Sequence, residues 1–187
     1  QPGETVSPDQ VVKELAMPVF VKPNNGGSSF GITKVKSAEA LPEAIEKAFS
    51  EGTEVLIESS ITGTEVTCGL YKIGKKGMVL PLTEVVTDNE FFDFDAKYNG
   101  QVEEITPARI PDEWTQQIQQ LSARIYDLIG AKGLIRVDFI VSDEGHPTVL
   151  EINTSPGMTV TSFIPQQIEA AGLDIQDVMK EIVESAF

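Results

Sequence analysis

Hydrophobic and polar residues alternate along two neighbouring segments of the chain, GLIRVDFIV (133–141) and PTVLEIN (147–153). A period of two is typical of strands that bury one face. The residues DEGH (143–146), which lie between them, are typical of a tight turn. The pattern therefore predicts a β-hairpin, with a two-residue turn at Glu144 and Gly145.

Similar patterns predict the other elements. Strands are expected at 18–22, 32–37, 54–59, 64–73 and 78–86. Helices are expected in a short segment that begins at Pro8 after a Ser7 cap, at 38–50, at 112–129 and over the last 25 or so residues, with a break at Gly172. The longest helix has an apolar stripe of Ile118, Leu121, Ile125, Leu128 and Ile129. Strands and helices do not alternate regularly, which favours an α+β fold in two lobes over a doubly wound parallel sheet.

The hairpin register places four polar side chains on one face. Asp138 lies opposite Glu151 and Arg136 opposite Asn153, while the other face carries the pairs Val137–Ile152 and Phe139–Leu150. Two carboxylates about 5 Å apart repel each other unless a cation lies between them. Carboxylate and amide oxygens suit Mg²⁺, and the arginine suits a phosphoryl group. The alternative is a solvated Arg–Asp–Glu cluster, and a bulged turn would shift the register by one residue.

A glycine-rich loop, NNGGSSFG (24–31), follows the strand that ends at Lys22. Its backbone amides and two serine hydroxyls could bind an anion, and the lysine ammonium could meet a phosphate. The loop lacks both the Walker pattern and the dinucleotide G-x-G-x-x-G. The alternative is a mobile hairpin loop with a solvated lysine. If it does bind phosphate, a nucleotide held jointly by this loop and the carboxylate pair would connect the two features.

Composition narrows the class of protein. A net charge of −15 argues against a nucleic-acid or anionic-membrane surface. No apolar run is long enough to span a bilayer, and the single cysteine excludes an internal disulfide framework. We therefore expect a cytoplasmic protein. No strand precedes the first helix, so we also expect that the chain is a piece of a longer protein.

Five segments occur along the chain in this order: VKPNNGGSSFG, GTEVT after a glutamate, DFDAKY, RVDF and LEINTSPGMT. On these segments the chain resembles the ATP-grasp enzymes and, within them, the D-alanine–D-alanine ligase group. The resemblance extends from about Met17 to the end of the chain. It implies the remainder of a central lobe at 1–58 and a C-terminal lobe at 59–187, with a lid loop at about 89–100. It also implies that the family's N-terminal lobe is absent.

The resemblance also implies the site residues. For ATP these are Lys22, Gly27, Ser28, Ser29, Glu58, Ile61, Glu65 and Lys97; for two Mg²⁺ ions, with Mn²⁺ as an alternative, they are Asp138, Glu151 and Asn153. For the reaction they are Arg136, Ser28, Tyr98 and Gly157, and for the second D-alanine Ser162 and Phe163. Phe163 departs from the leucine that is more common in the family.

The implied activity is the ATP-dependent joining of two D-alanine molecules through an acyl phosphate, for peptidoglycan precursors in a bacterial cytoplasm. Tyr98 favours an amine over a hydroxy acid as the second substrate. The implied full-length enzyme is a homodimer, and this chain alone is expected to be inactive. Two alternatives stay open: another ATP-grasp ligase, using D-lactate, D-serine or a different amine, and a non-catalytic nucleotide-binding module.

Overall fold

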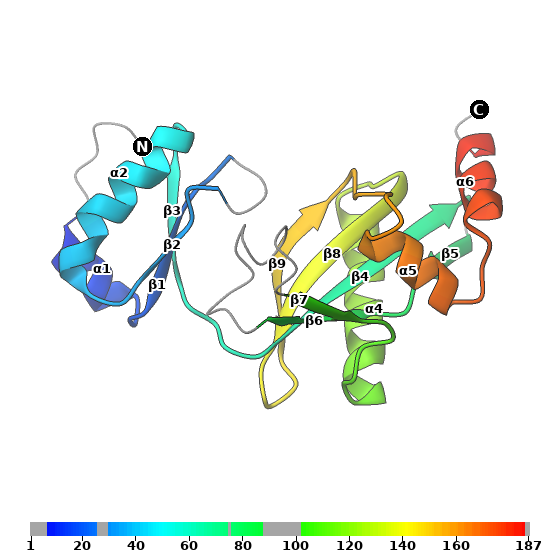
Figure 1. The fold of residues 1–187 in the computed structure, drawn as a ribbon, viewed down its shortest axis with the longest axis horizontal. Helices are drawn as coiled ribbons and strands as arrows, with labels where there is room; N and C mark the ends of the chain where they lie inside the picture. Colours follow the sequence, from blue (N-terminus) through cyan, green and yellow to red (C-terminus); the bar gives the residue numbers. More distant parts are fainter. Residues whose placement is uncertain (1–6, 26–29, 75, 88–101, 186–187) are drawn as a thin grey trace. The chain divides into compact units, whose positions relative to one another are not determined.

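The computed structural model describes residues 7–25, 30–74, 76–87 and 102–185 (Figure 1). The chain divides into two compact units. The first comprises residues 1–61 together with 87–102, and the second comprises 62–86 together with 103–187. Each unit has its own sheet and its own hydrophobic core.

The first unit is a three-stranded antiparallel sheet, in the order β2-β1-β3, with helices packed on one face. Its elements are α1 (Pro8–Glu14), β1 (Val19–Pro23), β2 (Thr33–Val35), the 3-10 helix η1 (Ala38–Ala40), α2 (Leu41–Glu51) and β3 (Val55–Ser59). Side chains alternate along β1, so Val19 and Val21 lie in the core with Leu41 of α2. Lys22 therefore belongs to the other face of the sheet.

The second unit is a six-stranded sheet in the order β7-β6-β4-β8-β9, with β5 also paired to β4. Its elements are β4 (Thr64–Ile73), β5 (Lys76–Val79), β6 (Thr83–Thr87), β7 (Val102–Ile105), α4 (Asp112–Leu128), β8 (Gly133–Val141), β9 (Pro147–Asn153), α5 (Phe163–Ala170) and α6 (Ile175–Glu184). Strand β4 pairs antiparallel with β5, β6 and β8, and β8 pairs antiparallel with β9.

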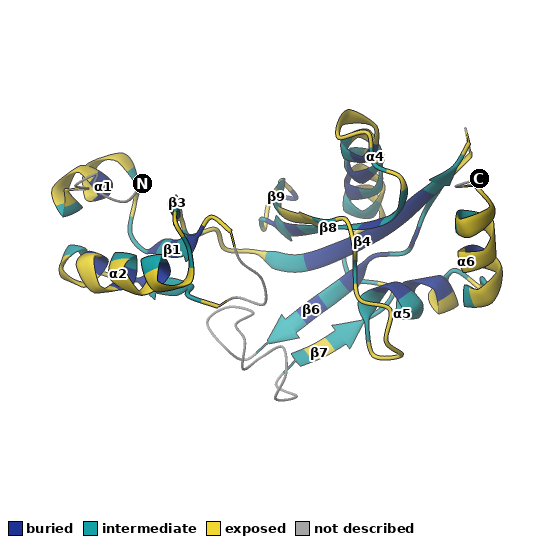
Figure 2. Cartoon of the chain, turned by 90° about the horizontal axis from the view of Figure 1, so that it is seen from above, coloured by how far each residue is buried: buried dark blue, intermediate teal, exposed yellow. Residues whose placement is uncertain are grey.

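Helices cover both faces of this sheet (Figure 2). One core packs α4 against the sheet through Ile118, Val137 and Phe139. A second core packs α5 and α6 against the other face through Ile164 and Val178. Because side chains alternate along β8, the residues between its α4-facing positions point to the α5 side. Arg136 and Asp138 are two of those residues.

The β8–β9 hairpin keeps the expected pairing at the polar end but not at the turn. The pairs Arg136–Asn153, Val137–Ile152 and Asp138–Glu151 are confirmed. The two-residue turn is wrong: Ser142 donates its N–H to the carbonyl of His146 over 3.1 Å, which leaves a three-residue loop. Phe139 consequently faces Val149 instead of Leu150, and a bulge next to Asp138 restores the expected register.

Two other expectations need correction. Residues 78–86 do not form one strand: β5 ends at Val79 and β6 begins at Thr83. Leu80 still donates its N–H to Gly69 of β4, but Pro81 has no N–H to donate. In α4, Leu128 is 86% exposed and Ile129 44% exposed. Leu128 lies roughly 80° around the helix from the buried Ile118, at 100° per residue, and Ile129 follows the helix as its C-cap.

The helix ends follow the sequence closely. α1 begins at Pro8 as expected. The backbone carbonyl of Ser7 accepts the first N–H groups of the helix, and the Ser7 side chain makes no capping bond. The carboxylate of Asp174 caps α6 by accepting the N–H groups of Gln176 and Asp177 over 2.7 and 3.2 Å. The break at Gly172, where φ is 69°, is also confirmed.

Candidate functional site

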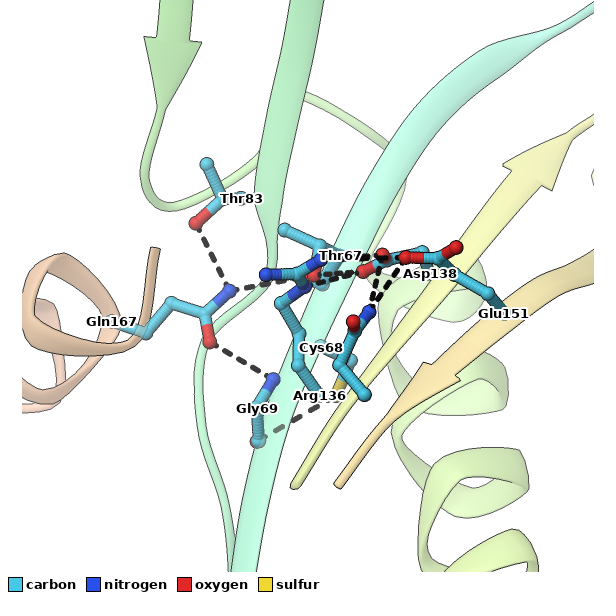
Figure 3. A network of polar contacts seen from close by, with 9 residues as sticks. Thr67, Cys68, Gly69, Thr83, Arg136, Asp138, Glu151 and Gln167 are labelled. Carbon is cyan, nitrogen blue, oxygen red and sulfur yellow. Dashed lines mark hydrogen bonds and ion pairs between the residues drawn. The ribbon is translucent and has the colours of Figure 1, made fainter. Parts of the chain in front are cut away.

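The carboxylate of Asp138 is the centre of a polar cluster on the α5-facing side of the sheet (Figure 3). Arg136, two residues earlier on β8, donates from Nε and Nη2 to its two oxygens, each over 2.8 Å. Thr67 of β4 donates its hydroxyl over 2.6 Å, and Asn153 of β9 donates its amide over 3.1 Å. Three adjacent strands therefore fix this one carboxylate.

Asn153 lies between the two carboxylates that were expected to bind a metal ion. Its Nδ2 donates to Asp138 and also to Glu151, the latter over 2.8 Å. Two like charges on facing strands need a positive or hydrogen-donating group between them, and the amide supplies that group here. If the amide turns over, its oxygen points to the same place. Two carboxylates and one amide oxygen then face a common point, so the residues fit a Mg²⁺ ion.

These side chains cannot complete a metal site by themselves. Within the described residues, no group of three or more His, Cys, Asp and Glu side chains could hold a metal ion. Mg²⁺ takes six ligands, and it commonly keeps waters or takes oxygens from substrate phosphates. The donor set is therefore suited to a metal ion that arrives with a phosphorylated ligand.

Arg136 lies close to two carboxylates and to an aromatic ring. Its guanidinium carbon lies 5.1 Å from the centre of the Phe163 ring, at the start of α5, and its Nη2 lies 3.8 Å from Glu151. Burial lowers its pKa, but the hydrogen bonds to Asp138 and the charges of Asp138, Glu151 and Glu104 outweigh burial, so its pKa is raised. The arginine is therefore a fixed, permanently charged group.

The segment that leads into α5 folds back on itself. The hydroxyl of Ser162 accepts the N–H of Thr159 over 3.1 Å and lies 2.8 Å from the Thr159 hydroxyl. It also lies against Gly157, where an added Cβ would come within 2.8 Å of it. The Ser162 side chain makes no capping bond to α5. The first amides of the helix therefore have no side-chain acceptor at this position.

In the first unit, two of the expected nucleotide residues form an ion pair. Lys22 Nζ of β1 donates to Glu58 Oε1 of β3 over 2.6 Å, with both side chains partly exposed. Ile61, at the end of this unit, is 38% exposed. Glu65 lies on β4 in the second unit, paired with Val85 and Ile140. Gly27, Ser28, Ser29, Lys97 and Tyr98 lie outside the described residues.

Sequence patterns gave no indication of three contributors to the cluster. Thr67 reaches Asp138 because β4 pairs with β8, a long-range pairing that the local pattern of either strand does not reveal. Glu104 of β7 accepts from Gln166 of α5 over 2.6 Å. Burial raises the pKa of Glu104, against the hydrogen bond from Gln166 and the charge of Arg136, which lower it. The side-chain amide of Gln167 donates to the backbone carbonyl of Thr67.

No helix among the residues that the structure describes is long and apolar enough to cross a membrane.

Comparisons with known proteins agree with one another. The family described as "D-ala D-ala ligase C-terminus" matches residues 3–184. The chain is 66% identical over 182 residues to a D-alanine–D-alanine ligase of Parabacteroides distasonis, covering 97% of this chain and 55% of that protein. This chain thus spans about half the length of such curated relatives.

Solved structures give the fold. The VanG D-Ala:D-Ser ligase of Enterococcus faecalis superposes with a TM-score of 0.86 at 34% identity, over 96% of this chain and 52% of that one. A D-alanine–D-alanine ligase of Bacillus anthracis, solved in complex with ATP, gives 0.75 at 28% identity, over 98% and 55%. The chain therefore has the ATP-grasp fold and belongs to the D-alanine–D-alanine ligase C-terminal family.

Proposed function

We propose that this chain is part of an ATP-dependent ligase that joins two D-alanine molecules through an acyl phosphate. The observation that carries the proposal is the cluster on β8 and β9, where Arg136, Asp138, Glu151 and Asn153 converge on one face. Relatives named D-alanine–D-alanine ligase, 54–66% identical to this chain, support the choice of substrate. The activity is proposed for the full-length protein.

Asp138, Glu151 and Asn153 are proposed to hold Mg²⁺, with Mn²⁺ as an alternative. Bound there together with the phosphates of ATP, the ion supplies positive charge that stabilises the negative charge of phosphoryl transfer. Thr67 and Arg136 keep the Asp138 carboxylate in one orientation. Precise orientation matters because a metal-binding side chain that must reorient lowers the affinity of the site for the ion.

For the nucleotide, we propose Lys22 and the loop residues Gly27, Ser28 and Ser29 against the phosphates, with Lys97 as a further phosphate ligand. Glu58 and Ile61 would contact the adenine, and Glu65 the ribose. The ion pair of Lys22 with Glu58 supports a role for both, because each keeps the other ordered and neutralised until a ligand takes its place.

The reaction has two steps. A carboxylate oxygen of the first D-alanine attacks the γ-phosphorus of ATP, which gives an acyl phosphate and ADP. The amine of the second D-alanine attacks the carbonyl carbon, loses a proton and expels phosphate as the peptide bond forms. Arg136 can bind the transferred phosphate and the oxyanion of the tetrahedral intermediate, and the Gly157 N–H can bind the same oxyanion. Ser28 and Tyr98 would assist the reaction.

The second substrate is proposed to bind at the start of α5. Its carboxylate would meet the Ser162 hydroxyl and the first amides of the helix, which the Ser162 side chain does not cap. Phe163 would bound the same site with its ring, which already lies on Arg136. The homodimer and the cytoplasmic location stay predictions from the sequence.

The test uses the full-length protein with Mg²⁺, ATP and D-alanine alone. We expect release of ADP in a one-to-one ratio with D-alanyl-D-alanine, measured by a coupled ADP assay and by mass spectrometry. ADP release without dipeptide, or no turnover of a folded protein that still binds nucleotide, would reject the ligase. The second of these results would favour the non-catalytic module.

D-serine is the second candidate for the acceptor, because the VanG D-Ala:D-Ser ligase superposes closely on this chain. Its identity of 34% is well below the 66% of the Parabacteroides distasonis D-alanine–D-alanine ligase. Equimolar D-alanine, D-serine and D-lactate should therefore yield mainly D-alanyl-D-alanine. A mixed product rich in D-serine would favour this second candidate, and a D-lactate product would remove the argument from Tyr98.

A further inference from the structure

Strand β4 changes partner halfway along one of its edges. It pairs with β6 over Glu65–Thr67 and with β5 over Leu70–Ile73. Between these two partners, Leu80 still donates its N–H to the carbonyl of Gly69 over 2.9 Å, and no strand includes residues 80–82. The N–H of Gly69 therefore lies between the two strand pairings on this edge, and this section of the strand is buried. Buried backbone groups need hydrogen-bond partners, so something else must satisfy this gap.

The side-chain amide of Gln167, on α5, fills the gap (Figure 3). Its Oε1 accepts the N–H of Gly69 over 2.9 Å, and its Nε2 donates to the carbonyl of Thr67 over 3.0 Å. The second hydrogen of Nε2 goes to the Thr83 hydroxyl of β6 over 3.0 Å. One amide thus acts as a peptide group between the two strand pairings and joins α5 to both β4 and β6.

The contact leaves no room for adjustment. Gln167 is fully buried. A Cβ at position 69 would lie 2.5 Å from Gln167 Oε1 and 2.5 Å from Ile164 Cδ1, so only glycine allows the helix to lie this close. The place of α5 on the sheet is therefore set by a short contact and three hydrogen bonds.

This contact is connected to the chemical cluster by two routes. Through the sheet, Thr67 offers its carbonyl to Gln167 and its hydroxyl to Asp138, which binds Arg136. Through the helix, Phe163 lies four residues before Gln167, so both project from the same side of α5, and its ring lies on Arg136. The two routes close a ring of contacts that runs through the helix, β4 and β8.

We propose that Gln167 is a positioning residue, which fixes α5 on β4 so that Phe163 lies over Arg136 and the start of the helix meets the acceptor. The inference rests on the proposed function for its effect on catalysis. It assigns no contact between Gln167 and a substrate. The contact between helix and sheet itself can be tested without any activity.

The test compares two variants of the full-length protein that disturb the contact from opposite sides. Gln167→Leu keeps the size of the side chain but removes three hydrogen bonds, and Gly69→Ala keeps the glutamine but pushes the helix away. Displacement of a binding group by about 1 Å can cost on the order of a hundredfold in rate. We expect both variants to raise the KM for D-alanine about tenfold or more and to leave the KM for ATP unchanged.

Two controls separate positioning from general loss of stability. Ile118→Val removes one methylene from the core on the opposite face of the sheet, so it destabilises the unit without touching α5. Gln117→Leu makes the same chemical change at an exposed site on α4. We expect the KM for D-alanine to stay at the wild-type value in both. An equal rise in Ile118→Val, or no rise in folded Gln167→Leu, would overturn the proposal.

Hydrogen exchange tests the contact independently of the reaction. The amide of Gly69 should exchange faster in Gln167→Leu than in the wild type, while amides of β4 that are bonded to β8 keep their protection. Unchanged protection of Gly69 would overturn the inference. If the wild-type protein makes no dipeptide, the proposed function fails, but this exchange result still decides whether Gln167 holds the helix to the sheet.

Discussion

Arg136 shows most clearly how single residues define this site. Its guanidinium makes two bonds to the two oxygens of Asp138, which requires a group with several donors, and its carbon lies 5.1 Å from the centre of the Phe163 ring. A lysine would keep the charge but not the paired bonds. Charge and geometry can therefore be separated by experiment.

In the full-length protein, Arg136→Lys should lower kcat by about a hundredfold or more, the cost typical of losing a fixed group that stabilises developing charge. Steady-state rates of dipeptide formation measure it. Arg109→Lys is the matched control, because Arg109 also pairs with a carboxylate, that of Glu84, but is 60% exposed. Equal, small effects of the two substitutions would mean that the paired geometry of Arg136 has no catalytic role.

Glu104 predicts a dependence of stability on pH. Because its pKa is raised in the folded protein, the folded state binds more protons than the unfolded state above the usual value of 4.5. The stability contributed by this group is therefore present at low pH and is lost as the pH rises through the folded pKa. Glu104→Gln removes the titration and keeps an acceptor for Gln166.

We expect the free energy of unfolding of Glu104→Gln to exceed that of the wild type at neutral pH and to converge with it below about pH 4.5. Urea denaturation at several pH values measures this difference. Glu103→Gln, at the exposed neighbouring position, is the matched control for the loss of one negative charge from β7. The prediction is wrong if Glu104→Gln is the less stable protein at pH 7.

At the scale of elements, the β8–β9 hairpin depends on a glycine at its turn. Gly145 has a φ of 82°, and a Cβ there would lie 2.2 Å from Nε1 of Trp114. Gly130 has a similar φ of 63°, but its Cβ would meet nothing within 4 Å. The two positions separate backbone strain from steric overlap.

Gly130→Ala should lower the free energy of unfolding by about 1–2 kcal/mol, the cost of the left-handed conformation alone. Gly145→Ala should lower it by about 2–5 kcal/mol, because displacement of Trp114 adds about 1–3 kcal/mol. Chemical denaturation of both variants measures the difference. Equal losses would show that the tryptophan moves aside freely.

Local patterns predicted this hairpin well because its two strands are close in sequence. Alternation and residue counts together placed Asp138 opposite Glu151, although the turn was one residue longer and a bulge compensated. The contacts of Thr67 and Gln167 could not be found in this way. They join residues 71 and 100 positions apart, and they depend on the order of strands and on the docking of α5.

At the scale of the whole molecule, the proposed ligands are divided between two units with separate cores. Lys22, Glu58 and Ile61 belong to the first unit, and the metal ligands and the acceptor site belong to the second. Neither unit carries the complete set. Substitutions in the second unit should therefore change the dependence on metal and acceptor more than the binding of the adenine.

The most direct test of the account is the Mg²⁺ dependence of D-alanyl-D-alanine formation by the full-length protein, compared with that of Glu151→Gln and Glu144→Gln. Both glutamates belong to the β8–β9 hairpin, but Glu144 lies in its turn and binds Ser142. We expect Glu151→Gln to require about 10–100 times more Mg²⁺, as for weakened metal sites, and Glu144→Gln to match the wild type. An unchanged requirement in Glu151→Gln would contradict the proposed metal site.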